Sequence, residues 1–315
     1  MDKKRYILDN TLFIIPLLTF SRSVLIASDL TTLPPYRGER SFILRAIREL
    51  HYRMKLPFFS IWYYPIDREY ETFFIFDGIS PNYVEWLHRK YPQSKLILFY
   101  NNKCEPYDSP DRYPYEFLTM WSGDVNDCRR WKILNMTPMV GAYAKSWLFR
   151  KRQPEFDVFF IGQDKGFKRM KVLNDLEKRF RAMGLNPFFY VTAAHRYDRY
   201  RNKDYKKPIP YETSLEYLSK SKSILYLGYG SQECVTIRVQ ESLIHKIKLI
   251  TDCTWIKKYD FYTPNNIFIL GEDDVENLPK FLNSPYEEVK SDFLNHIYFE
   301  DLAFEIIQSS YNNRS

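Results

Sequence analysis

The stretch FDVFFIGQDKGFKRMKVLNDLEKRFRAMGLNPFFYV, residues 156–191, decides the fold class. It starts with a short apolar run that ends in Gly162, as a buried parallel strand does. From Met170 onward, apolar residues recur at spacings of three and four, which predicts a helix that ends at Gly184. A second apolar run, PFFYV, follows at once. This strand–helix–strand order predicts a parallel α/β sheet.

The same alternation extends along the whole chain. In the second half, strands are expected at 187–191, 223–228, 248–251 and 266–270, with helices at 211–220, 235–246 and 273–282. In the first half, strands at 23–28, 58–64, 72–77 and 95–100 alternate with helices at 41–54 and 81–91. We therefore predict an α/β protein with two Rossmann-like, doubly wound domains that face a cleft.

A charged, proline-containing segment, WLFRKRQP at 147–154, separates the two halves. It places the boundary between an N-terminal domain at 1–150 and a second domain at 151–285. Residues 286–315 are helical in pattern, and we expect them to pack back on the first domain.

Composition excludes several classes of protein. Of the 315 residues, 45% are hydrophobic and 27% are charged, which excludes wholesale disorder. The formal net charge of +7 favours an anionic partner without naming it. The four cysteines and five histidines show no metal-ligand spacing, so we expect reduced thiols and no metal. The apolar run at 11–20 is too short to span a bilayer, and a buried strand or short interfacial helix is expected there.

Ligands of parallel sheets bind beyond the carboxyl ends of the strands, so the loops that follow strands are the places to search. The loop at 161–171 combines Gly162 with Lys165 and Lys168 ahead of a helix N-terminus, which suits a diphosphate. Spacing alone favours a surface turn with solvated lysines. The loop at 29–40 brings Gly38 to a place where a backbone can approach a ligand, or forms a proline-shaped connection.

The segment LGYGSQECVTIRVQESL at 227–243 is the most specific in the chain. If one helix carried both Glu233 and Glu241, their carboxylates would lie about 12 Å apart along it and suit opposite ends of a nucleotide-sugar. Arg238 would then reach a phosphate. The alternative is an ordinary i,i+3 pair between Arg238 and Glu241, with Glu233 as a solvated loop charge.

These segments together resemble the glycosyltransferases of the GT-B architecture: a strand followed by PPYRGER, then IGQDKGFK, then E-x7-E at 233–241. The resemblance is closest to retaining enzymes that use nucleotide-sugar donors. Three stretches, 121–128, 232–241 and 249–267, are similar more narrowly to bacterial proteins of capsule and lipopolysaccharide assembly.

The resemblance implies that the N-terminal domain at 1–150 binds the acceptor and that the domain at 151–285 binds the nucleotide-sugar donor. It also implies roles for individual residues. Gly38 would face the donor phosphate and Lys165 would hold it, while Glu233 would contact the sugar and Glu241 the ribose. The donor-binding set as a whole would be Gly38, Gly162, Lys165, Lys168, Gly230, Gln232, Thr236, Arg238 and Glu241.

The stereochemical outcome stays open between inversion and retention. Inversion needs a group that takes the proton of the acceptor hydroxyl, and Asp77 and Asp124 fall at strand ends in the acceptor half. With Glu233 they form the catalytic candidates, although such aspartates are more often caps or turn residues. Retention would rely on phosphates held by the cations of the donor site.

The expected function is transfer of a sugar from a nucleotide-sugar to a bacterial surface glycan (capsule, O-antigen or lipopolysaccharide) or its lipid-linked precursor, without a cofactor or metal. We expect a cytoplasmic protein whose basic residues, Lys3 to Arg5 and Arg150 to Arg152, favour peripheral contact with the inner face of an acidic membrane. The alternatives are a non-catalytic nucleotide- or nucleic-acid-binding protein and a degenerate transferase retained in an assembly. No nucleic-acid partner is expected, because neither half has a concentrated basic stripe.

Overall fold

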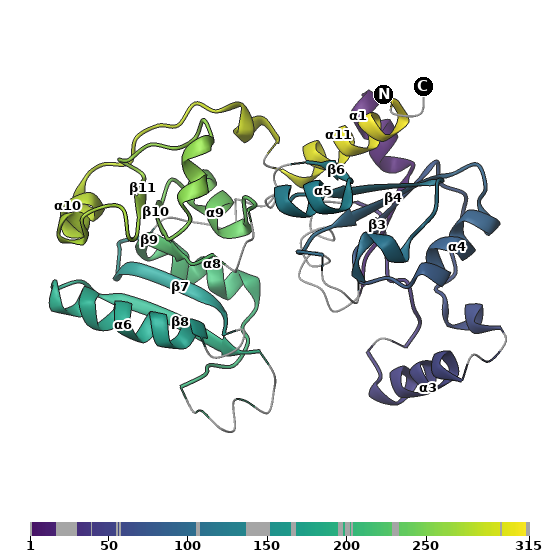
Figure 1. Cartoon of the computed structure of the whole chain (residues 1–315), viewed down its shortest axis with the longest axis horizontal. Coiled ribbons are helices and arrows are strands. Elements are labelled where there is room, and N and C mark those ends of the chain that lie inside the picture. The colour runs from purple at the N-terminus through teal and green to yellow at the C-terminus, as the bar shows by residue number, and fades with distance from the viewer. Residues whose placement is uncertain are drawn as a thin grey trace. The chain divides into compact units, whose positions relative to one another are not determined.

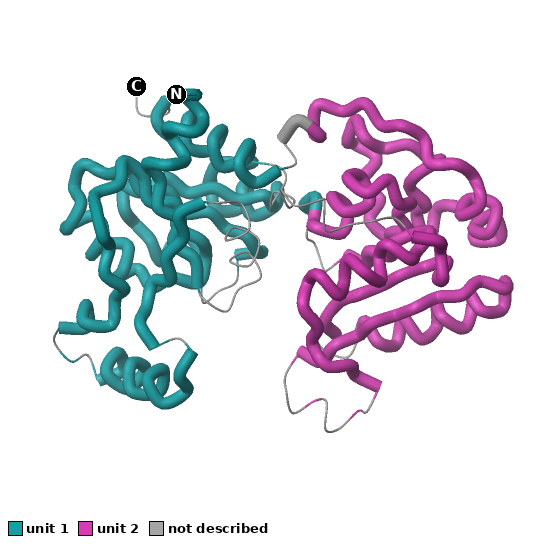
Figure 2. Tube along the Cα trace, turned by 180° about the vertical axis from the view of Figure 1, so that it is seen from behind, with its two compact units in different colours: residues 1–144, 232–235, 295–315 teal, residues 145–231, 236–294 magenta. Residues whose placement is uncertain are grey.

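The computed structural model describes residues 2–16, 30–38, 40–54, 56, 58–104, 108–136, 152–164, 168–194, 198, 202, 204–228, 233–296 and 298–312. The chain forms two compact units (Figure 2). Unit 1 comprises residues 1–144, 232–235 and 295–315, and unit 2 comprises residues 145–231 and 236–294. The domain boundary expected near residue 150 lies outside the described residues.

Unit 1 is built on a six-stranded parallel sheet with the order β2-β1-β3-β4-β5-β6 (Figure 1). The strands are β1 (Thr11–Ile14), β2 (Thr32–Leu33), β3 (Thr72–Phe76), β4 (Lys95–Tyr100), β5 (Leu118–Ser122) and β6 (Leu134–Asn135). Every residue of β1, β3 and β4 is buried. Continuous apolar runs such as TFFIF therefore form the middle of the sheet, where both faces are covered.

Helices cover both faces of this sheet. On one face, α4 (Pro81–Lys90) buries Tyr83, Val84 and Leu87 in the core. On the other face, α1 (Lys3–Asp9) and α11 (Phe299–Asn312) lie side by side (Figure 1), and the ring of Phe299 packs 5.8 Å from that of Phe13. The other helical elements among the described residues of unit 1 are α3 (Phe42–Arg53), η1 (Phe59–Trp62), η3 (Pro110–Arg112) and α5 (Val125–Trp131).

Unit 2 contains a five-stranded parallel sheet with the order β11-β10-β9-β7-β8. The strands are β7 (Phe156–Asp164), β8 (Pro187–Ala193), β9 (Ser221–Tyr226), β10 (Lys248–Thr251) and β11 (Ile267–Ile269). One face packs against α6 (Lys168–Ala182) and α10 (Leu278–Asn283). On the opposite face, α8 (Tyr211–Ser219) places Tyr217 against Phe159, and α9 (Ile237–His245) contacts β9 and β10. Short 3-10 turns are η5 (Thr254–Lys258), η6 (Val275–Asn277) and η7 (Asp292–His296).

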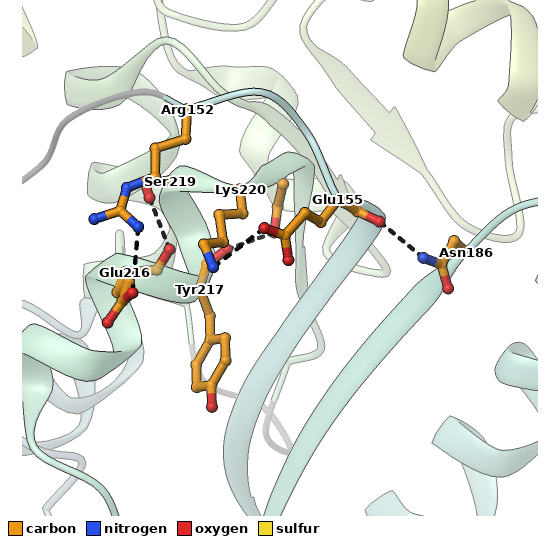
Figure 3. Close-up of polar contacts among 8 residues, drawn as sticks. Arg152, Glu155, Asn186, Glu216, Tyr217, Ser219 and Lys220 are labelled. Carbon is orange, nitrogen blue, oxygen red and sulfur yellow. Dashed lines mark hydrogen bonds and ion pairs between the residues drawn. The ribbon is translucent and has the colours of Figure 1, made fainter.

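Polar contacts hold the amino end of β7 (Figure 3). The Arg152 guanidinium reaches Glu216 of α8 at 3.3 Å, and the Lys220 ammonium reaches Glu155 at 3.2 Å. Asn186, just before β8, donates from Nδ2 to the carbonyl oxygen of Glu155 at 2.8 Å. Exposed ion pairs of this kind contribute at most about 1 kcal/mol each. They occupy the amino edge of the sheet, which leaves the carboxyl edge for a ligand.

The α/β class with two doubly wound parallel sheets is confirmed by the strand orders and by the helices on both faces. The strand expected at 58–64 is wrong: residues 59–62 form η1, and Phe58 before it has a left-handed φ of 62°. The strand expected at 23–28 lies outside the described residues. Of the C-terminal segment expected to be helical, the described residues form helix only in α11 and η7. The elements α1 and β2 and the β5–α5–β6 region were not predicted. No described helix is both long and apolar enough to cross a membrane.

Candidate functional site

The strand order of unit 2 reverses between β7 and β9. β7 pairs with β9 as far as Phe159 opposite Ile224, but with β8 as far as Asp164. No later pairing joins β7 to β9 among the described residues, so the last part of β7 lacks a partner on that side. Such a reversal point at the carboxyl edge is where open α/β sheets bind ligands.

Arg169, in the first turn of α6, bridges this point. Its guanidinium donates to the carbonyl oxygen of Gln163 at 2.9 Å and to that of Leu227 at 3.3 Å, so it connects the ends of β7 and β9. The Arg169 N–H donates to the carboxylate of Asp164 at 3.0 Å, which fixes the start of the helix. The guanidinium forms no ion pair with a carboxylate in the described part of the chain, so its charge is not neutralised there.

Two glycines give the strand ends their shape at this edge. A Cβ at Gly162 would lie 3.0 Å from the ring of Phe160, a tight contact, and 3.5 Å from the guanidinium of Arg169. A Cβ at Gly228 would lie 2.7 Å from the Sγ of Cys253, closer than real contacts allow, so glycine is needed where β9 ends. The N–H of Gly228 donates to Asp252 at 2.7 Å, which ties the end of β9 to the end of β10.

The N-terminus of α9 lies after β9 in the same unit. Thr236 is its N-cap residue, yet its side chain forms no capping hydrogen bond. The Thr236 hydroxyl is buried and has no hydrogen-bond partner within the described residues. Unpaired N–H groups at a helix N-terminus attract anions, and a hydroxyl beside them adds a further donor.

The carboxylate of Glu241 is almost completely buried in α9. It accepts a hydrogen bond from the Tyr211 hydroxyl at 2.7 Å and pairs with the Arg238 guanidinium at 2.5 Å. The i,i+3 helix pair, considered above as the alternative, is therefore formed. The ribose contact implied for Glu241 stays a prediction.

Glu233 and Glu241 do not share a helix, because α9 begins at Ile237. The half-buried Glu233 belongs to unit 1, in the segment 232–235. Its N–H donates to the Asp124 carboxylate at 3.2 Å, and its carbonyl oxygen accepts from the N–H of Val125 at 3.3 Å. The 12 Å helical separation considered above therefore does not describe this pair, and a sugar contact by Glu233 stays a prediction.

Asp124 is fully buried at the end of β5. Its Oδ1 accepts from the N–H groups of Asn126 and Asp127 at 2.9 and 3.0 Å, so it caps α5, while Oδ2 accepts from Glu233. These contacts hold the loop after β5 and segment 232–235 together. They are the contacts of a positioning group, and a direct catalytic role for Asp124 stays a prediction.

Asp77 follows β3 at the carboxyl edge of the first sheet and is half-buried. Its oxygens accept from the Asn101 N–H at 3.2 Å and from the Asn102 amide at 3.0 Å. The pKa of Asp77 is raised to about 6, chiefly by burial, with the Asp108 carboxylate acting in the same direction and the hydrogen bonds from Asn101 and Asn102 opposing it. A carboxyl group with this pKa is mostly ionised at pH 7. It therefore accepts a proton at neutral pH and loses this capacity as the pH falls through 6.

A cavity of about 330 Å³ lies near the same edge of unit 1. Tyr36, Arg48, Arg112 and Asp108 are among the residues that line it. Asp108 accepts from the N–H of Gly78 at 2.6 Å, which shapes the loop after β3. A cavity of this size with both cationic and aromatic walls suits part of a polar acceptor.

The structure describes the other predicted site residues to different extents. Gly38 is described: it has a φ of 72°, and a Cβ there would lie 2.7 Å from the Cβ of Leu44, so local packing already requires glycine. Lys168 begins α6, and nothing is described of its side chain. The remaining three, Lys165, Gly230 and Gln232, lie outside the described residues.

Sequence reasoning missed Arg169 and Tyr211. Arg169 directly follows the two lysines that drew attention, and its place in the first turn after β7 was the available signal. The partnership of Tyr211 with Glu241 joins residues 30 positions apart and had no sequence signal. Within the described residues no group of three or more His, Cys, Asp or Glu side chains is placed to hold a metal ion.

No protein-family model and no curated protein matches the chain. Among solved structures it is similar to the DNA-modifying enzyme β-glucosyltransferase, with 13% identity over 95% of this chain and 94% of that chain and a TM-score of 0.46. It is also similar to the N-terminal domain of Candida albicans trehalose-6-phosphate phosphatase (10% identity, 95% and 92% coverage, TM-score 0.45). A third is the catalytic domain of Arabidopsis thaliana starch synthase IV (10% identity, 88% and 76% coverage, TM-score 0.42). TM-scores below 0.5 do not establish a shared fold. The fold is instead established by the strand orders of the two sheets, and the candidate site is described by the contacts of its residues.

Proposed function

We propose that the chain is a glycosyltransferase whose unit 2 binds the diphosphate of a nucleotide-sugar donor. The observation that carries this proposal is the guanidinium of Arg169 at the reversal point between β7 and β9, where, within the described residues, its hydrogen bonds go to backbone carbonyl oxygens. A planar guanidinium matches phosphate oxygens in pairs and binds them more strongly than neutral donors do.

Further groups of unit 2 support an anionic ligand at this edge. The buried hydroxyl of Thr236 and the N-terminus of α9 supply donors, and α9 follows β9, whose end Arg169 contacts. We assign Lys165, Lys168, Gly230 and Gln232 to the same site. In the transfer step these cations and donors would stabilise negative charge on the departing nucleoside diphosphate.

For the acceptor, we propose a bacterial surface glycan or its lipid-linked precursor, a choice that rests on the sequence resemblance. Unit 1 offers Asp77 as a general base, because its pKa of about 6 leaves it ionised at neutral pH. This assignment favours inversion. Asp124 would act as a positioning residue, because its carboxylate holds the backbone of Glu233.

The test is thermal denaturation of the protein with UDP, GDP, ADP, CDP and CMP. A ligand that binds only the native state at a concentration of 100 times Kd adds about 2.7 kcal/mol to the free energy of unfolding. We expect one nucleoside diphosphate to raise the transition temperature, and the matching nucleoside without phosphates to leave it unchanged. The absence of a shift with every nucleotide would contradict a donor site.

Catalysis is separated from binding by the release of nucleoside diphosphate from the matching nucleotide-sugar. A glycosyltransferase releases it when acceptor glycan is added, whereas a non-catalytic nucleotide-binding protein shows the thermal shift without release. Oligonucleotide binding that weakens steeply with salt would instead favour a nucleic-acid-binding protein.

A further inference from the structure

The helix α3 of unit 1 turns its apolar side to solvent. Ile43, Ile47, Leu50 and Met54 recur at spacings of four, three and four, so they lie within an arc of about 60° on one side of the helix. Their exposed fractions are 68%, 48%, 58% and 58%. A helix that packs on its own protein turns such a stripe toward the core. α3 does the reverse, and we call these four side chains the α3 stripe.

Contacts on the other sides of α3 fix this orientation. The Arg48 guanidinium lies 4.4 Å from the centre of the Tyr36 ring, and the indole N–H of Trp62 donates to the His51 ring at 3.1 Å. Arg48 and His51 are accordingly less exposed than the stripe. Figures 1 and 2 both show α3 away from the sheet of unit 1, at one end of that unit.

Further apolar side chains are exposed just after the helix in the chain. Leu56, Phe58 and Ile61 are 44%, 80% and 58% exposed. Phe58 is held in the left-handed region with a φ of 62°, which is uncommon for an aromatic residue. Together with the α3 stripe, these make seven large apolar side chains exposed between residues 43 and 61, and clustered apolar side chains of this kind are typical of a surface that another molecule covers.

The charge of the same segment indicates what covers it. Residues 37–58 contain five arginines and one lysine against two glutamates, a formal net charge of +4 out of +7 for the whole chain. Arg45 of α3 is exposed and forms no ion pair within the described residues. A helix with an apolar side, flanked by arginines, is typical of helices that lie in the interface of an anionic bilayer.

We propose that α3 docks unit 1 on the surface of an anionic lipid bilayer. The α3 stripe enters the boundary between headgroups and acyl chains, and the arginines contact lipid phosphates. This placement differs from the one expected from sequence, which relied on Lys3 to Arg5 and Arg150 to Arg152. Lys4 pairs with Asp301, Arg5 with Asp9 and, within α3, Arg53 with Glu49, so the placement on α3 rests on the exposed stripe and on Arg45. The inference does not rest on the proposed transferase activity, which is tested with soluble nucleotides.

The experiment is co-sedimentation of the full chain with vesicles of phosphatidylglycerol and phosphatidylcholine in equal parts. We expect the protein to sediment with them, to bind pure phosphatidylcholine more weakly, and to be released by high salt. Recovery of the protein in the supernatant with the mixed vesicles would overturn the proposal, whatever the behaviour of any variant.

The double variant Ile47→Asp/Leu50→Asp tests the stripe itself. Since both side chains are exposed, we expect an unchanged thermal transition and a loss of at least about tenfold in vesicle partitioning. Val172→Asp is the matched control, because Val172 is 47% exposed on α6, and it should partition as wild type does.

Two results for this double variant would refute docking through α3. One is sedimentation with the mixed vesicles to the same extent as wild type. The other is a wild-type dimer, seen by analytical ultracentrifugation without lipid, that the double variant converts to a monomer. In the second case the stripe is covered by another copy of the chain rather than by lipid.

Discussion

Replacement of Arg169 by Met is expected to weaken the binding of the stabilising nucleoside diphosphate about 100-fold. The variant removes the charged fork that connects Gln163 and Leu227, and a hydrogen bond to a charged group is worth about 1.5–3 kcal/mol. Loss of about 2.7 kcal/mol corresponds to the expected factor. Isothermal titration calorimetry on wild type and variant measures it directly.

The matched control is Arg179→Met. Arg179 is exposed in the last turn of the same helix, 10 positions further along the chain, so this variant removes the same charge far from the strand ends. It should bind the nucleotide as wild type does. Arg169→Lys keeps the charge without the planar fork and should fall between the two. If Arg169→Met bound the nucleotide with wild-type affinity, the Arg169 guanidinium would not be part of the donor site.

Replacement of Glu241 by Ala is expected to lower the free energy of unfolding of unit 2 by about 3 kcal/mol. The variant leaves the largely buried Arg238 guanidinium without its counter-ion and the Tyr211 hydroxyl without its acceptor. Removal of one partner of a buried ion pair is strongly destabilising, because the remaining charge stays desolvated. Urea unfolding of wild type and variant gives the difference.

The matched control for this variant is Glu177→Ala. Glu177 pairs with Arg181 on the surface of α6 at 2.7 Å, and loss of such an exposed i,i+4 pair costs about 0.5 kcal/mol. If Glu241→Ala lost no more stability than Glu177→Ala, the buried contacts of Glu241 would not contribute measurably to the free energy of unfolding. The expected result also means that Glu241→Ala combines instability with any binding defect, so Arg169→Met is the cleaner probe of the donor site.

Hydrophobic patterning predicted the fold because buried parallel strands need continuous apolar runs. TFFIF and KLILFY form central strands for this reason. FFSIWYY is equally apolar but forms η1, because Phe58 takes a left-handed φ and the chain turns. The four apolar residues of the α3 stripe were predicted to lie on one side of a helix. Whether that side faces the core or solvent depends on the contacts of Arg48 and His51, two residues outside the stripe.

The site was predicted less completely than the fold. The loop after β7 was the right place to search, because parallel strands present their carboxyl ends at one edge. Within it, Arg169 makes contacts that the sequence did not predict, because its guanidinium reaches the carbonyl oxygens of both Gln163 and Leu227. The link between Asp124 and Glu233 joins residues 109 positions apart, and local spacing contains no trace of it.

Hydrogen–deuterium exchange with the stabilising nucleoside diphosphate tests the central claim most directly, because it shows where the ligand sits. A diphosphate at the carboxyl edge of unit 2 should slow exchange in peptides that cover residues 160–172 and 226–242. These peptides contain Arg169, the end of β9 and the N-terminus of α9. Slower exchange confined to other parts of the chain, or no change while the nucleotide is bound, would contradict the proposed donor site.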